Sequence, residues 1–126
     1  MKKIIPVPDA PKAGGQYSHA VQAGNLLFTA GQIGLDPETD QLVEGGIEAE
    51  TRQTLENLST ILKAAGLDLS RVVKANVYMD DIGNRSVINR IYTEYFPVEP
   101  PARTSLQVAA LPREAKVEIE LIALMD

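Results

Sequence analysis

Charged residues interrupt an otherwise apolar segment at the C-terminal end of the chain, PPARTSLQVAALPREAKVEIELIALMD, residues 100–126. A guanidinium binds a carboxylate through two parallel hydrogen bonds, and a glutamate near an apolar surface can act as a general base because burial raises its pKa. Arg103, Glu118 and Glu120 are therefore the first candidates for chemistry. Charges at such positions can also be solvated on an open sheet face without any chemical role. The pattern alone leaves both interpretations open.

The alternation of apolar and polar residues in this segment predicts two β-strands joined by the turn LPRE. If Ala110 pairs with Ala115, Ser105 lies opposite Glu120, and Arg103 lies on the order of 13 Å from Glu118 along the strands. We expect Arg103 and both glutamates on the face away from the helices, with Thr104, Leu106, Val108 and Ala110 on the apolar face. Such a gap requires either a ligand between the charges or a partner from another chain, and self-association would cover the open face.

The rest of the chain supplies the elements that must position these residues. The turn AGN predicts a hairpin of residues 17–21 and 26–30, and an apolar spacing of three and four residues predicts a helix over 46–65 that ends at Gly66. A strand over 71–80 and a helix over 84–96, capped by Asn84, follow. The order β-β-α-β-α-β-β predicts an α+β fold, a mixed sheet with two helices packed on one face, in a single domain over residues 1–126.

Composition limits the classes of function. The chain has 126 residues, a net charge of −5 and no cysteine, so thiolate chemistry and cysteine metal sites are excluded and nucleic acid is an unfavourable partner. No signal-peptide core and no apolar run of about 20 residues is found, which predicts a cytoplasmic protein that does not cross a membrane. His19, the only histidine, is expected to have a surface or packing role.

Several blocks of the sequence resemble the RidA (YjgF) family of imine and enamine deaminases, in order and with similar spacing from about Tyr17 onward. They are GQYSHAV, FTAGQIGLDPETD, ETRQTLENLSTILKAAGLDLSRVVKANVYMDD, INRIYTEYF and PPARTSLQVAALPREAKVEIELIAL. The resemblance implies a chorismate-mutase-like fold and a homotrimer whose sheets form a central barrel, with active sites between subunits. It also implies hydrolysis of 2-imino acids or their enamine tautomers to 2-keto acids and ammonia, without cofactor or metal.

The resemblance also implies roles for individual residues. Arg103 matches the arginine that binds the substrate carboxylate, and Glu118 matches the glutamate that holds or activates water, with Glu120 as its structural neighbour. Tyr17 and Asn89 match residues that line the cleft, although packing and capping roles explain both types as well.

Three small residues complete this comparison. Gly31 could let the backbone approach a ligand closely, although a β-bulge explains a glycine in a strand equally well. Ser105 stands where some members have cysteine. Ala30 stands where many have serine, and its neighbour Thr29 should point to the other face.

Three hypotheses follow. The first is a cofactor-independent deaminase that acts on small imino or enamino acids. The second is a non-catalytic protein that binds small carboxylates, which would need Arg103 but not Glu118. The third, a ribonuclease or translation inhibitor, has little support from an acidic chain with few aromatic residues.

Overall fold

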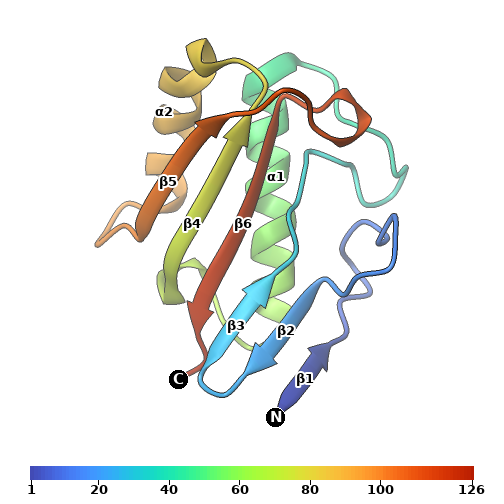
Figure 1. Cartoon of the computed structure of the whole chain (residues 1–126), viewed down its shortest axis with the longest axis vertical. Coiled ribbons are helices and arrows are strands. Elements are labelled where there is room, and N and C mark those ends of the chain that lie inside the picture. Colours follow the sequence, from blue (N-terminus) through green and yellow to red (C-terminus); the bar gives the residue numbers. More distant parts are fainter.

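The computed structural model describes residues 1–126 as one six-stranded sheet covered on one face by two helices (Figure 1). The strands and long helices are β1 (Lys2–Ile5), β2 (Ala20–Ala23), β3 (Leu26–Thr29), α1 (Gly46–Ala64), β4 (Val72–Met79), α2 (Arg85–Tyr95), β5 (Ala102–Gln107) and β6 (Val117–Leu124). Short 3-10 turns lie at Leu69–Arg71, Ile82–Asn84 and Pro112–Glu114. The mixed α+β fold expected from the sequence is confirmed, with β1 as an additional edge strand.

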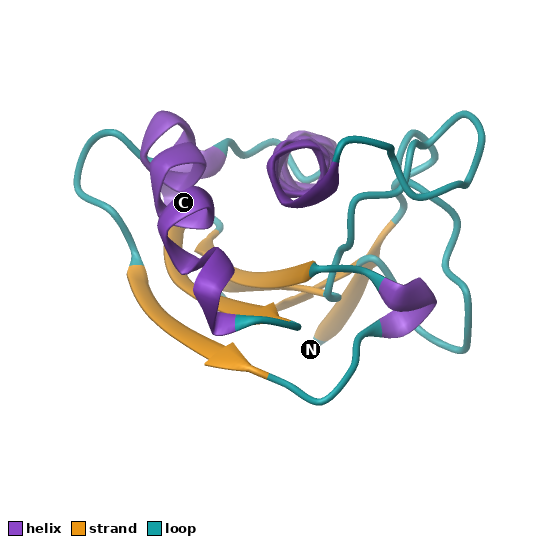
Figure 2. Cartoon of the chain, turned by 90° about the horizontal axis from the view of Figure 1, so that it is seen from above, coloured by secondary structure: helices purple, strands orange, loops and turns teal.

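The sheet order is β1-β2-β3-β6-β4-β5, and all neighbours are antiparallel except β4 and β5, which are parallel. The predicted C-terminal hairpin is therefore wrong, because β4 lies between β5 and β6. The chain passes from β4 through α2 into the parallel strand β5, and residues 108–116 then cross the end of β4 to reach β6. Both helices lie on the same side of the curved sheet (Figure 2).

Strand β6 supplies the centre of the core. Its residues alternate between buried and half-buried, and Val117, Ile119, Leu121 and Ala123 face the helices, as expected. They pack against the apolar face of α1, which includes Leu55, Leu58, Ile61 and Leu62. The opposite face of the sheet carries Glu118 and Glu120 and has no helix over it.

The helix ends follow from local sequence. At the end of α1, Gly66 has a φ of +80°, its N–H donates to Lys63 O, and Leu67 N–H donates to Leu62 O, which is the pairing of a Schellman motif. The predicted cap of α2 is wrong, since the Asn84 side chain makes no cap hydrogen bond. Asp81 instead accepts a hydrogen bond from Gly83 N–H at the start of the preceding 3-10 turn. Neither long helix is sufficiently long and apolar to cross a membrane.

Candidate active site

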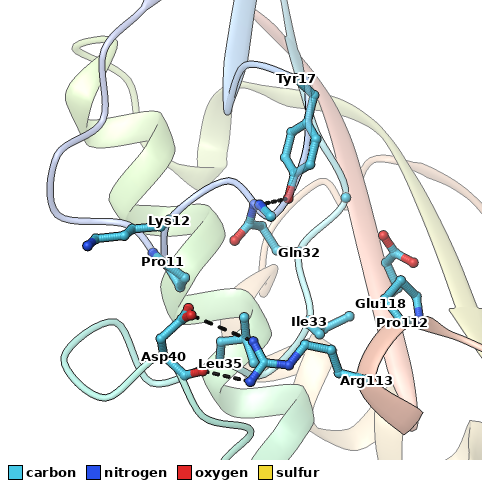
Figure 3. Close-up of a pocket in the computed structure, with 12 residues that line it drawn as sticks. Pro11, Lys12, Tyr17, Gln32, Ile33, Leu35, Asp40, Pro112, Arg113 and Glu118 are labelled. Carbon is cyan, nitrogen blue, oxygen red and sulfur yellow. Dashed lines mark hydrogen bonds and ion pairs between the residues drawn. The ribbon is translucent and has the colours of Figure 1, made fainter.

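A cavity of about 340 Å³ opens beside the start of β6 (Figure 3). Its walls come from the loop before β2, from the segment that follows β3, and from the turn before β6. It is lined by Pro11, Lys12, Gly14, Tyr17, Gly31, Gln32, Ile33, Leu35, Asp40, Pro112, Arg113 and Glu118. Three residues predicted from the sequence, Tyr17, Gly31 and Glu118, therefore lie in one cavity.

Glu118 lies directly against Gly31. A Cβ atom built on Gly31 would lie 2.9 Å from the carboxyl carbon of Glu118 and closer still to one of its oxygens, so a larger residue here would displace this carboxylate from its position. The backbone bulges here as well, because Phe28 pairs with Ile122 whereas Gln32 pairs with Ile119, which leaves one extra residue on the β3 side. Thr29 Oγ1 accepts the Leu121 N–H within this bulge, so its hydroxyl is committed to the sheet. The bulge expected as one explanation for Gly31 is therefore present, and the glycine also gives the Glu118 side chain room; the close approach to a ligand stays a prediction.

The environment of Glu118 favours a proton-transfer role. Burial raises the pKa of Glu118, and repulsion from Glu120 adds to this effect. Glu118 forms no hydrogen bond or ion pair within the chain. Glu120 is held differently, because its Oε2 accepts hydrogen bonds from Asn76 Nδ2 at 3.0 Å and from Tyr78 Oη at 3.2 Å. Glu118 is thus the free carboxylate of the pair.

Tyr17 is placed by the folding of its own loop. Its side chain is 51% exposed, and its hydroxyl accepts a hydrogen bond from Gly14 N–H at 3.0 Å. The distance from His19 Nε2 to the carbonyl oxygen of Pro11 is 2.6 Å, and this contact joins the two ends of the loop. The loop presents the ring of Tyr17 at the upper side of the cavity (Figure 3).

A second group of predicted residues lies between β5 and α2. Arg103 Nη2 donates a hydrogen bond to Asn89 Oδ1, and the guanidinium lies 4.6 Å above the ring centre of Tyr92. Burial lowers the pKa of Arg103, with a contribution from the positive charge of Arg85, whereas Tyr92 acts in the opposite direction. No carboxylate lies within 4 Å of Arg103, so this half-buried cation has no anionic partner in the chain.

The face assigned to Arg103 from the sequence is wrong. Arg103 contacts α2 and pairs with buried Ala75, so it lies on the helix side of the sheet, whereas Glu118 lies on the open side. Ser105, two residues further along β5, shares the helix side, and Leu106 is 49% exposed on the open side.

The distance between the two candidates is also large. Arg103 pairs with Ala75 and Glu118 with Tyr78, three residues apart on β4. This separates them by about 10 Å along the strands, in addition to two strand spacings of about 4.8 Å each. The predicted residues of one chain therefore form two separate groups, which we name half-sites: a carboxylate half with Tyr17, Gly31 and Glu118, and a guanidinium half with Arg103, Asn89 and Ser105.

Several lining residues were not predicted. Arg113 Nη2 donates to the carbonyl oxygen of Asp40 at 2.8 Å, and this contact closes one side of the cavity (Figure 3). Lys12 and Gln32 also line it. These residues lie in loops or irregular segments, where periodicity gives no signal. No three His, Cys, Asp or Glu side chains lie close enough together to hold a metal ion.

Comparison with known proteins identifies the family. The family model described as Endoribonuclease L-PSP matches residues 7–125. The chain belongs to this family. The resemblance to RidA is confirmed by a solved RidA from a Psychrobacter species, which is 43% identical with a TM-score of 0.93 and covers 97% of this chain and 98% of its own.

Two further relatives of this RidA family member carry informative names. A 2-iminobutanoate/2-iminopropanoate deaminase of Mus musculus is 49% identical over 98% of this chain and 91% of its own length. The structure of E. coli TdcF with bound serine is 37% identical with a TM-score of 0.92, over 97% of this chain and 98% of that one. The similarity therefore spans nearly the whole length of each protein.

Proposed function

We propose that this protein hydrolyses small 2-imino acids and their enamine tautomers, such as 2-iminopropanoate and 2-iminobutanoate, to 2-keto acids and ammonia. The mouse relative is named for this deaminase activity, and the likeness covers residues of both half-sites. The reaction consumes one water and releases one ammonia, so it requires a group that handles protons and a group that holds the carboxylate. We assign these tasks to Glu118 and Arg103, within a single domain of residues 1–126.

The observation that carries these roles is the presence of two unpaired, partly buried groups of opposite charge. Arg103 lacks an anionic partner, and Glu118 lacks any hydrogen-bond or ion-pair partner. Unpaired charges are costly to bury, so a ligand that satisfies both is favoured. A 2-imino acid offers a carboxylate to the arginine and an electrophilic carbon to water held by the glutamate.

A complete site requires a second copy of the chain, since the two half-sites lie on opposite faces of one sheet. We propose a homotrimer in which β5 and α2 of one subunit place Arg103, Ser105 and Asn89 beside the Glu118 cavity of its neighbour. The open sheet face supports association, because Ile4, Phe28 and Leu106 are 51%, 40% and 49% exposed in the isolated chain. The number of subunits and the central barrel rest on the RidA family resemblance.

The mechanism follows from these positions. Arg103 binds the two carboxylate oxygens and orients the imine carbon. Glu118, whose pKa is raised by burial, accepts a proton from water as the water oxygen attacks this carbon. That proton passes to the nitrogen and gives a neutral carbinolamine. Glu118 then takes the hydroxyl proton and delivers it to the nitrogen as the C–N bond breaks, so that ammonia leaves and the carbonyl of the 2-keto acid forms. Tyr17 and the backbone at Gly31 shape the space around the reacting carbon.

The test is the rate at which purified protein removes 2-iminopropanoate generated in situ from alanine by an amino-acid oxidase. We expect Arg103→Ala to lower kcat/KM by about 100-fold or more, because it removes two charge-assisted hydrogen bonds. Arg90→Ala is the matched control, since Arg90 forms an exposed ion pair with Glu48 and touches neither half-site. Full turnover by Arg103→Ala would refute this mechanism.

A second candidate is a non-catalytic binder of small carboxylates, which the serine bound to the related TdcF favours. Such a protein would use Arg103 and would not require proton transfer by Glu118. Calorimetric titration with serine distinguishes the two candidates when it is combined with the turnover assay. Binding of serine without any turnover by the wild type would establish the binder and overturn the deaminase.

The name of the family model raises a third possibility, RNA cleavage. The net charge of −5 opposes association with phosphates, and the two basic residues that line the cavity, Lys12 and Arg113, are accompanied there by the carboxylates of Asp40 and Glu118. We therefore assign the cavity to small carboxylates rather than to RNA.

A further inference from the structure

Tyr92 forms the floor beneath the guanidinium of Arg103. It lies three residues after Asn89 on α2, so both side chains project from the same side of the helix. The Arg103 carbon Cζ is 4.6 Å from the centre of the ring, and Nη2 reaches Asn89. Two neighbouring side chains of one helix thus hold the same guanidinium, one through its flat face and the other through its edge.

The hydroxyl of Tyr92 does not explain its position. The residue is 6% exposed, and its Oη is buried without a hydrogen-bond partner. Burial raises the pKa of Tyr92 to about 12, so the phenol is neutral at physiological pH and offers no negative charge to Arg103. The feature available to the arginine is the electron-rich face of the ring, to which a guanidinium is attracted.

We infer that Tyr92 is a positioning residue that holds Arg103 in place for the substrate carboxylate, through the contact between its ring face and the guanidinium. This inference rests on the proposed function. Asn89 takes one N–H of the guanidinium, which has five, and the chain gives Arg103 no other hydrogen bond. The remaining donors are available to the two oxygens of a carboxylate, and the ring restricts the plane in which they lie.

The experiment compares three variants in the full chain, with kcat and KM measured for 2-iminopropanoate at steady-state concentrations set by the amount of oxidase. Tyr92→Leu removes the ring face, and we expect KM to rise by about 5- to 30-fold with kcat nearly unchanged. Tyr92→Phe keeps the ring and should retain the KM of the wild type. Phe96→Leu is the matched control, because its ring centre lies 4.5 Å from that of Tyr92 in the same core but its ring makes no cation–π contact with Arg103.

The KM values and unfolding temperatures of these variants together separate a positioning role of Tyr92 from a general loss of stability. Both leucine variants lose an aromatic ring from one core and should unfold at lower temperature, but only Tyr92→Leu should raise KM. An unchanged KM in Tyr92→Leu, or an equal rise in Phe96→Leu, would overturn the inference. A rise in KM in Tyr92→Phe equal to the rise in Tyr92→Leu would also overturn the inference, because the hydroxyl would then be the essential group.

A fluorinated series covers the case in which Tyr92→Leu does not fold. Phenylalanine with an increasing number of ring fluorines at position 92 weakens the ring-face attraction at nearly constant size, so KM should rise stepwise. A constant KM along the series would contradict the inference while the wild type remains active. Absence of turnover by the wild type would remove the proposed function, and this inference with it.

Discussion

Glu120 tunes Glu118 from two residues away on the same face of β6. Its charge is held in place because one oxygen, Oε2, accepts both the Asn76 and the Tyr78 hydrogen bonds. The pKa of Tyr78 is raised by burial and then by Glu120, so this phenol stays a neutral donor. Glu120 thus acts on Glu118 through its negative charge, and the two donors fix where that charge lies.

Glu120→Gln removes this charge while the amide oxygen can keep both hydrogen bonds. Burial is the larger cause of the raised pKa of Glu118, and Glu120 is the smaller one, so the pKa should fall but not return to its ordinary value. Because the proposed mechanism uses the ionised form, the acid limb of the kcat/KM profile against pH should move to lower pH.

The control for this shift is Glu56→Gln. Glu56 accepts a hydrogen bond from Tyr95 on the helix side of the molecule, and the substitution makes the same change in net charge. Its pH profile should match that of the wild type. A Glu120→Gln profile with the acid limb unmoved, or moved to higher pH, would show that Glu120 does not raise the pKa of Glu118 or that Glu118 is not the group that titrates.

At the scale of elements, α1 builds the cavity wall through buried polar side chains. Asn57 Nδ2 donates to the carbonyl oxygens of Ile33 and Leu35, at 3.2 and 2.9 Å. Glu50 Oε1 accepts the N–H of Lys116, just before β6. Gly34 lies so close to α1 that an added Cβ would be 2.9 Å from Glu50 Cα. Helix α1 therefore supplies the segment after β3 with hydrogen bonds and packing that a neighbouring strand would otherwise provide.

Asn57→Ala should destabilise this arrangement by about 2 kcal/mol or more, because two buried carbonyl groups lose their donor. Urea unfolding at a single protein concentration measures the loss. Gln53→Ala is the matched control, since it removes only the hydrogen bond to Asn57 Oδ1 and should cost about 1 kcal/mol or less. Equal losses in the two variants would contradict this account of the cavity wall.

The same elements show what the sequence can and cannot predict. Apolar spacing located α1, α2, β4 and β6 within a few residues, because each buries a regular stripe. The partner of β5 was not predictable in this way, since alternation gives the two faces of a strand but not its neighbours. A loop such as 108–116 is long enough either to make a hairpin or to cross β4.

The face of β5 was misassigned for a related reason. At an edge strand the helix side is only partly covered, so Arg103 and Ser105 can lie there while Leu106 faces outward. An arginine and a glutamate were predicted for the candidate site because these residue types suit the proposed chemistry. The division of the candidate site into two half-sites and the contact between Arg103 and Tyr92 were not predictable, because they depend on how α2 packs against β5.

At the scale of the whole molecule, the proposed site shared between subunits would make activity a property of the assembly. If each site takes Arg103 from one subunit and Glu118 from its neighbour, two inactive variants can complement each other. Arg103→Ala retains the glutamate half, and Glu118→Gln retains the arginine half.

Mixed trimers of these two variants should show about a third of the wild-type activity, because in a trimer that contains both variants roughly one of the three sites joins two intact halves. The variants are co-expressed with different tags, and mixed oligomers are purified on both tags before the 2-iminopropanoate assay. Each variant alone, and a mixture of the two made after assembly, provide the baseline. Mixed oligomers no more active than this baseline would place the complete site within one chain, although Arg103 and Glu118 lie on opposite faces of its sheet.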